Sequence, residues 1–269
     1  MDMSYEIKTV QLPEYSMNYF SFGTGKKTMV ILPGLSVQSV MASADAIAQA
    51  YDIFASKYTV YVFDRRNELS EAYSIHQMAD DTAEAMKVLG LEKIHLFGAS
   101  QGGIMSLLIA SRYPELVSKI VVGSATCHVN KFMEKTVGKW ISLAEKGDGV
   151  ALYLDFGEKL YPKAAFESFK DMMVQAGQSV TSEELSRFVT MASSMNNLDI
   201  REEIKNIACP VLILGAGDDA VLGNEAYKEL KECLLDAEMF VYNGYGHAAF
   251  DMAPDYKKRI YRFFEGEIG

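Results

Sequence analysis

The chain has 269 residues, of which 49% are hydrophobic, enough for one large α/β domain or a core domain with an inserted lobe. Its formal net charge is −10 and its pI is near 5.0, so most of its surface would repel polyanions and we expect no nucleic-acid partner. No apolar run approaches the roughly 20 residues that span a bilayer, and residues 1–6 lack the basic and apolar segments of a signal peptide. We therefore expect no membrane partner and a cytoplasmic protein.

The three cysteines, Cys127, Cys209 and Cys233, are widely spaced and odd in number. This argues against a disulfide scaffold and against metal ligation by paired cysteines, and it suits a reducing cytoplasm. Cys127 and His128 are neighbours, but no second pair accompanies them to complete a metal site. The sequence predicts no metal and no cofactor.

The chain begins with two patterns that predict an antiparallel pair of strands, at residues 4–11 and 16–22. We interpret Gly23-Thr24-Gly25-Lys26, which follows them, as a hairpin turn into the next strand. Its Gly-Lys pair has the wrong spacing for a phosphate-binding loop.

Short apolar runs, rich in β-branched and aromatic residues, then alternate with helical patterns. The runs are 29–32, 59–63, 94–97, 120–122, 211–214 and 239–242. Continuous apolarity is typical of parallel strands that are covered on both faces. The alternation predicts an α/β fold with a doubly wound, mostly parallel sheet, in which ligands bind at the carboxyl ends of the strands.

Three helices stand out between and after these runs. An apolar stripe over residues 79–89 predicts a helix that Gly90 can end. Residues 102–113 are apolar on almost every side, as a buried helix would be, and residues 256–264 carry another apolar stripe.

The alternation breaks between about residues 125 and 206, where only helical patterns occur. We expect a core of residues 1–124 and 207–269, with residues 125–206 forming an all-helical cap over the strand ends. Methionine fills irregular apolar gaps, so the methionines of this segment either line a pocket or pack the interior of the cap. They include Met133, Met172, Met173, Met191 and Met195.

The run Gly98-Ala99-Ser100-Gln101-Gly102 joins a predicted strand to a predicted helix. A Gly-x-Ser-x-Gly turn of this kind is strained and exposes the serine hydroxyl, and its glycines avoid side chains that would crowd the turn. The pentapeptide is specific only in context, because a nucleophilic serine needs a base and a group that orients the base.

Two later loops supply these groups in the chain order serine, acid, histidine. Asp218 and Asp219 follow one apolar run, and His247 follows the last. Since parallel strands end at a common edge, we expect Ser100, His247 and one of the two aspartates to converge.

Each of these residues also has an ordinary structural interpretation, as a turn serine, a solvated loop acid or a surface histidine. Three independent placements in the required order make coincidence the weaker explanation. The other histidines fit less well, because His95 lies inside a predicted strand, His76 begins a helix and His128 opens the helical segment.

An oxyanion hole in this arrangement uses the N–H group after the nucleophile and another from the loop after the third strand. Gln101 would supply the first. In Pro33-Gly34-Leu35, proline has no N–H and glycine lets the backbone approach closely, so we expect Leu35 to supply the second.

With these features the chain resembles the α/β-hydrolase superfamily, in a form with a helical cap, over essentially its whole length. The resemblance rests on Pro33-Gly34, Asp64-Arg65-Arg66, residues 98–103, Gly215 to Asp218 and Gly246-His247. It implies an eight-stranded sheet, a cap after the sixth strand and hydrolytic chemistry. It also favours Asp218 over Asp219, because the family's acid usually stands three residues after the glycine that ends the strand.

Two segments depart from the family pattern. Pro33-Gly34 replaces the common His-Gly of the oxyanion loop, which leaves the backbone donors in place. Residues 65–70, which begin with Arg65 and Arg66, replace the usual glycine-rich segment and alter a pocket wall in a way that the sequence does not define.

The sequence therefore predicts a serine hydrolase that acts on an ester-like bond of a small molecule through Ser100, His247 and Asp218. Carbon–carbon bond hydrolysis, thioester cleavage, lyase chemistry and acyl transfer to an alcohol remain open, because the fold does not choose among them. The oligomeric state is not predicted.

Two other classes of protein fit the sequence less well. A slow-turnover ligand-binding or sensor protein would keep the pocket but would not need the full triad. Residues 215–220 fit a loose dinucleotide-binding pattern, but Asp218 and Asp219 within that loop would repel a pyrophosphate.

Overall fold

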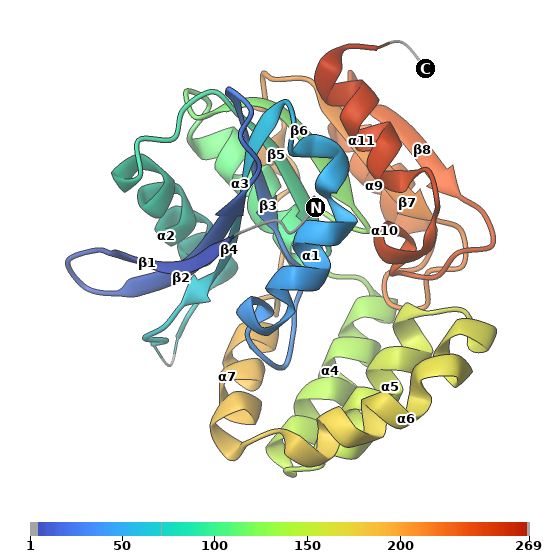
Figure 1. The fold of residues 1–269 in the computed structure, drawn as a ribbon. Coiled ribbons are helices and arrows are strands. Elements are labelled where there is room, and N and C mark those ends of the chain that lie inside the picture. Colours follow the sequence, from blue (N-terminus) through green and yellow to red (C-terminus); the bar gives the residue numbers. More distant parts are fainter. Residues whose placement is uncertain (1–4, 71, 268–269) are drawn as a thin grey trace.

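In the computed structural model, which describes residues 5–70 and 72–267, one eight-stranded sheet forms the centre of the molecule and helices cover both of its faces (Figure 1). The strands are β1 (Glu6–Gln11), β2 (Ser16–Phe22), β3 (Lys27–Leu32), β4 (Tyr58–Arg66), β5 (Ile94–Ala99), β6 (Val117–Gly123), β7 (Val211–Ala216) and β8 (Glu238–Tyr242). They lie in the order β1-β2-β4-β3-β5-β6-β7-β8. β1 and β2 run antiparallel to their neighbours and the other six strands are parallel, which confirms the predicted doubly wound sheet.

The helices divide between the two faces of the sheet and a separate group. They are α1 (Ala44–Ala50), α2 (Ile75–Val88), α3 (Gln101–Arg112), α4 (Lys131–Glu145), α5 (Gly149–Leu160), α6 (Lys163–Ser179), α7 (Ser182–Ser193), α8 (Arg201–Ile204), α9 (Glu225–Cys233), α10 (Ala249–Met252) and α11 (Tyr256–Glu265), with short 3-10 turns at Val40–Ser43 and Asp52–Phe54. Buried side chains of α2, α3 and α9 form one apolar layer against the sheet, and those of α1 and α11 form the other. The central strands are therefore buried on both faces, as their continuous apolarity predicted.

The hairpin predicted at residues 23–26 is wrong. The turn does connect β2 to β3, but these strands are not neighbours, because β4 lies between them and pairs with both. Gly25 is pressed against the chain entering β4, where a Cβ atom would lie 1.7 Å from the carbonyl carbon of Lys57. Local composition identified the turn, whereas the pairing was decided by a strand more than thirty residues further along the chain.

β8 also differs from the prediction of a strand covered on both faces. Met239 and Phe240 are 39% and 37% exposed. The reason is position, since β8 is the last strand of the sheet and pairs only with β7.

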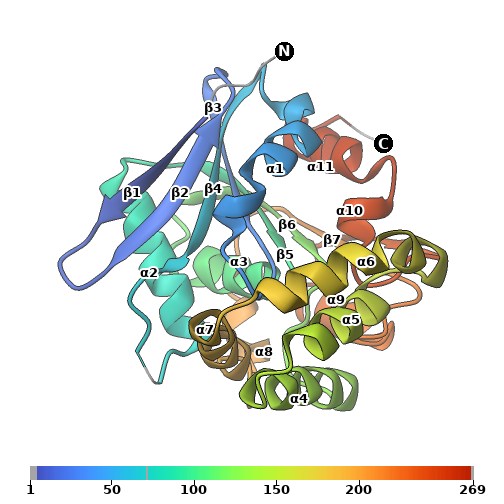
Figure 2. The same ribbon diagram turned by 60° about the horizontal axis from the view of Figure 1, so that its bottom comes forward.

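Residues 125–206 lie between β6 and β7 and contain α4 to α8 together with one isolated bridge between His128 and Asp199. Figures 1 and 2 show α4 to α7 gathered beyond one end of the sheet. Within the described part of the chain, none of the helices is both long and apolar enough to cross a membrane.

Glu265, near the C-terminus, fastens the last helix to the central strands. Its carboxylate accepts hydrogen bonds from Lys27 at 2.7 Å, from Lys57 at 2.8 Å and from the hydroxyl of Tyr58 at 2.7 Å. Burial of this carboxyl acts to raise its pKa, but the two ammonium groups and the tyrosine outweigh it and lower the pKa to about 2. The folded state therefore favours the ionised form of Glu265.

We expect Glu265→Gln to lower the free energy of unfolding at pH 7 by about 1–2 kcal/mol, because the half-exposed lysines lose an ionic acceptor. A lowered folded-state pKa stabilises the protein above the ordinary glutamate pKa, and this contribution is lost as the pH falls toward 2. The free energies of unfolding of wild type and variant, measured in urea, should thus converge as the pH falls from 4.5 to 2. Glu267→Gln, at an exposed neighbouring position, serves as the control. An equal loss of stability in this control would refute the stabilising role of Glu265.

Candidate active site

Ser100 occupies the single residue between the end of β5 and the start of α3. Its backbone has φ 52° and ψ −121°, a conformation that residues with a side chain rarely adopt. The backbone N–H of Ser100 donates to the carbonyl of Gly123 at 2.7 Å, which ties the turn to β6. The predicted strained turn is present, and it lifts the serine above the carboxyl edge of the sheet.

Gly98 and Gly102 make this turn possible through close backbone approach. A Cβ atom at Gly98 would lie 2.2 Å from the carbonyl oxygen of Gly102, and one at Gly102 would lie 2.0 Å from the carbonyl oxygen of Leu32. Backbone atoms cannot move aside as a flexible side chain can, so both positions exclude any larger residue. The N-terminus of α3 is thereby packed directly against the end of β3.

His247 lies in the loop between β8 and α10 and is almost completely buried. Its Nε2 atom is 2.9 Å from the Oγ atom of Ser100, so the structure brings these two predicted residues together. The hydroxyl of Ser124 donates to the carbonyl oxygen of His247 at 2.6 Å. The N–H of Ala248 donates to Leu160 at the end of α5, which connects the histidine loop to the helical segment.

The acid beside His247 is Asp219, and the prediction of Asp218 is wrong. The Oδ2 atom of Asp219 lies 2.8 Å from Nδ1 of His247. Asp218 is exposed, and its backbone N–H donates to the carbonyl of Tyr245 at 3.0 Å. The side chain of Asp219 is buried against the histidine, whereas Asp218 is exposed to solvent.

The carboxylate of Asp219 is fully buried but has donors on both oxygens. Oδ1 accepts the N–H groups of Val221 and Leu222 at 2.8 and 2.9 Å, and Oδ2 accepts the hydroxyl of Tyr227 in addition to His247. Burial acts to raise the pKa of this carboxyl, but the imidazole and the hydrogen bonds outweigh it and hold the pKa below its ordinary value. Asp219 is therefore an ionised acceptor near neutral pH.

The hydrogen bonds of this loop explain why Asp219 and not Asp218 is the acceptor. An aspartate whose side chain accepts N–H groups two and three residues later forms an Asx turn, and Val221-Leu222-Gly223 provides that turn here. Counting three residues from Gly215 selects Asp218 because it takes no account of where β7 ends, which is one residue later at Ala216.

Leu35 and Gln101, the predicted sources of two backbone donors, belong to segments that adjoin Ser100. Leu35 belongs to the loop after β3 and lines the same cavity as Ser100, while Gln101 is the first residue of α3. A Cβ atom at Gly34 would lie 3.2 Å from that of Ser100, so the two segments touch. Among the described residues, neither amide N–H donates a hydrogen bond.

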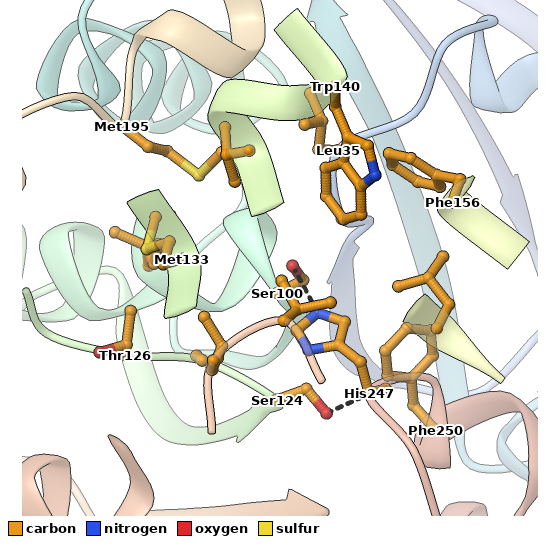
Figure 3. A pocket seen from close by; sticks show the side chains of 17 residues that line it. Leu35, Ser100, Ser124, Thr126, Met133, Trp140, Phe156, Met195, His247 and Phe250 are labelled. Carbon is orange, nitrogen blue, oxygen red and sulfur yellow. Dashed lines mark hydrogen bonds between the residues drawn. The ribbon is translucent and has the colours of Figure 1, made fainter. Parts of the chain in front are cut away.

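A cavity of about 60 Å³ opens beside Ser100 and His247 (Figure 3). In this view Trp140 and Phe156 lie to one side of the serine, and Met133 and Met195 to the other. The cavity is lined by Gly34, Leu35, Ser100, Ile104, Ser124, Ala125, Thr126, Met133, Val137, Trp140, Phe156, Leu160, Met195, Val221, Leu222, His247 and Phe250. None of these described residues is Asp, Glu, Lys or Arg.

The other polar side chains of the wall are already occupied. Ser124 donates to His247, Thr126 donates to the carbonyl of His128 at 3.0 Å, and the indole N–H of Trp140 donates to Asp155 at 2.9 Å. The surface offered to a ligand is therefore apolar apart from the serine, the histidine and nearby backbone amides.

The methionines of the helical segment divide between the two interpretations that the sequence allowed. Met133 and Met195 line the cavity, whereas Met191 is buried in the core and Met172 is 65% exposed. Methionine content alone therefore does not identify the pocket wall.

The remaining histidines and the cysteines lie outside this cavity. His95 is packed within β5, where burial together with Lys119 and Lys27 lowers its pKa to about 4. The three cysteines are free thiols, and the Sγ atoms of Cys127 and Cys233 are 3.9 Å apart.

Residues 27–254 match the sequence model of a family described as alpha/beta hydrolase fold. Among curated proteins, the chain is similar to the putative carbamate hydrolase RutD of Caulobacter sp. strain K31, with 23% identity covering 90% of this chain and 92% of that protein. A protein of the same name from Agrobacterium fabrum is 24% identical, covering 79% and 85%.

Solved structures show the same fold. MGS-M2, an alpha/beta hydrolase from a Medee basin deep-sea metagenome library, superposes with a TM-score of 0.85 at 21% identity, covering 97% of this chain and 98% of that one. The enol-lactonase of Burkholderia xenovorans LB400 superposes with a TM-score of 0.82 at 14% identity, covering 96% and 100%.

We expect Asp219→Ala to lower the free energy of unfolding by about 2–4 kcal/mol, because it leaves buried donors of the loop, the tyrosine and the imidazole without an acceptor. The matched control is Asp218→Ala, which removes an exposed carboxylate and should leave stability close to that of wild type. Urea unfolding at pH 7 compares the two. Similar losses in both variants would contradict the assignment of the buried acceptor to Asp219.

Proposed function

Because the chain belongs to the alpha/beta hydrolase family, we propose that it is a serine hydrolase that cleaves an ester-like bond of a small, uncharged molecule. The observation that carries this proposal is the continuous hydrogen-bonded chain from Ser100 through His247 to Asp219, with links of 2.9 and 2.8 Å. This is the arrangement of nucleophile, base and orienting acid that acyl transfer requires.

Each member of the triad has a separate role in the proposed reaction. With Nδ1–H of His247 donating to Asp219, Nε2 is left free to accept the hydroxyl proton of Ser100. The deprotonated oxygen attacks the carbonyl carbon, and the buried carboxylate stabilises the imidazolium that forms. His247 then returns the proton to the leaving alcohol, and later activates the water that hydrolyses the acyl-enzyme.

The oxyanion of the tetrahedral intermediate needs donors placed where the negative charge develops. We assign this role to the backbone N–H groups of Leu35 and Gln101, which flank Ser100 and have no other acceptor among the described residues. A donor of this kind typically contributes about 3–4 kcal/mol to lowering the barrier.

Residues 125–206 act as a cap in this proposal. Their helices supply the apolar wall opposite the triad, including Trp140 and Phe156, and they close the cavity to a small volume. A site that excludes water strengthens the electrostatic interactions with the developing charge.

The cavity also supports a substrate class. Its volume of about 60 Å³ suits a short acyl group, and none of its described lining residues is a cation that could hold an anionic substrate. The curated relatives are named as putative carbamate hydrolases, and a carbamate ion carries a negative charge. The absence of a cation among the described lining residues favours a neutral ester over such an ion.

We expect Ser100→Ala to lower kcat on p-nitrophenyl acetate and butyrate by about 10⁶-fold, because the nucleophile is lost. A fluorophosphonate should label wild type and leave this variant unlabelled. Ser106→Ala, in α3 but outside the cavity, should keep both the ester turnover and the fluorophosphonate labelling. Turnover at the wild-type rate in Ser100→Ala would refute the assignment.

The same assay should define the bond that is cleaved. Acetyl and butyryl esters are expected to react faster than octanoyl esters, and thioesters, 1,3-diketones and carbamate are tested beside them. Wild type that turns over none of these but is labelled at Ser100 would indicate another acyl substrate. Absence of both turnover and labelling would favour a binding or sensor protein.

We expect kcat/KM to fall between neutral and mildly acidic pH, since an imidazole that carries two protons cannot accept the proton of Ser100. Asp219 stays ionised over this range, because its pKa lies below the ordinary value. The acid limb should therefore report a single proton, with a slope of one on logarithmic axes. A flat profile over this range would exclude His247 as the base.

A further inference from the structure

Arg65, at the end of β4, connects the two segments that flank the serine turn. Its side chain is buried, with the residue only 4% exposed. One nitrogen, Nη2, donates both to the carbonyl oxygen of Pro33 at 2.8 Å and to Oε1 of Gln101 at 3.0 Å. Pro33 precedes Gly34-Leu35, and Gln101 directly follows Ser100. A single guanidinium thus joins the residues on which the proposed oxyanion hole is built.

These two segments have little room to move independently. A Cβ atom at Gly102 would lie 2.5 Å from the carbonyl oxygen of Pro33, so the start of α3 is in close contact with the same carbonyl that Arg65 holds. Because a peptide group is planar, fixing the direction of the Pro33 carbonyl also fixes the Gly34 N–H. Gly34 would otherwise allow this loop a wide range of conformations.

Further hydrogen bonds fix the backbone of Arg65 and the side chain of Gln101. Its N–H donates to Oδ1 of Asp64 at 2.7 Å, and the other oxygen of Asp64 accepts the hydroxyl of Ser39, at the far end of the β3 loop, at 2.5 Å. The Nε2 atom of Gln101 donates to the carbonyl of Met191 in α7 at 2.8 Å. The loop after β3 is therefore fixed at two points by β4, and the side chain of Gln101 extends from Arg65 to the helical segment.

Burial of the Arg65 guanidinium costs free energy of folding. Burial lowers the pKa of the Arg65 guanidinium, and its Nε atom has no hydrogen-bond partner among the described residues. A well-packed apolar side chain usually stabilises a buried position at least as well as a charged one does. A buried guanidinium that contacts two loop segments at once therefore suggests a requirement for their position.

We propose that Arg65 is a positioning residue that sets the backbone donors of Leu35 and Gln101 relative to Ser100. The proposal rests on the proposed function, because it concerns the oxyanion hole of that reaction. Arg65 is not among the residues that line the cavity, so it acts through Pro33 and Gln101 and does not touch the substrate.

The test compares Arg65→Met with wild type on p-nitrophenyl butyrate. Loosened donors weaken binding of the oxyanion but not of the ground-state ester, so kcat should fall about 10- to 100-fold while KM changes less than about threefold. The rate of fluorophosphonate labelling should fall by a similar factor. Arg65→Lys, which keeps a donor, should recover part of the loss.

The matched control is Arg66→Met, the adjacent buried arginine. Arg66 donates to Asp81 at 3.2 Å, and its guanidinium lies over the ring of Tyr73, whereas the hydrogen bonds to Pro33 and Gln101 come from Arg65. Its replacement should lower stability to urea without changing kcat or the labelling rate. Gln101→Met should reproduce part of the Arg65→Met loss, and combining the two should be less than additive because they share one contact.

The outcomes separate this inference from the one on which it rests. If wild type is active and labelled but Arg65→Met keeps its kcat and labelling rate, the positioning role is refuted and the proposed function stands. Equal losses in Arg65→Met and Arg66→Met would also refute it, because they would indicate a general effect on folding. If wild type is neither active nor labelled, both proposals fail.

Discussion

The carboxylate of Asp219 joins segments that follow two different strands of the sheet. It accepts two N–H groups from its own loop, a hydroxyl from α9 and the imidazole from the loop after β8. A buried negative charge is tolerated only with such a set of donors, and these donors in turn fix the direction of the carboxylate. The orientation of the imidazole beside Ser100 depends on this interaction.

The remaining parts of the site converge because the parallel strands end at a common edge. β3, β4, β5, β7 and β8 each deliver a different element there: the Gly34-Leu35 loop, Arg65, the serine turn, the acid and the histidine. Glycines at 98 and 102 let these elements approach to backbone contact. The candidate site is thus assembled from short loops on the sheet, and the helices between β6 and β7 supply part of its apolar wall.

Sequence patterns predicted what depends on local chemistry and strand order. The parallel sheet, the helix over residues 79–89, the strained turn at Ser100 and the meeting of Ser100 with His247 all follow from such patterns. The choice between adjacent aspartates did not, because it depends on the direction of side chains within an irregular loop. The wrong hairpin at residues 23–26 and the contacts of Arg65 share another cause, since both are decided by β4, which is distant in sequence.

The backbone conformation of Ser100 lowers the stability of this turn. A residue with a side chain at φ 52° is strained by about 1–3 kcal/mol, and glycine would adopt this conformation more easily. The packing of the described residues around the sheet does not require a hydroxyl group at position 100. The molecule thus retains a conformational penalty at the residue that we propose as the nucleophile, and replacing it by glycine would exchange the hydroxyl for a more relaxed backbone.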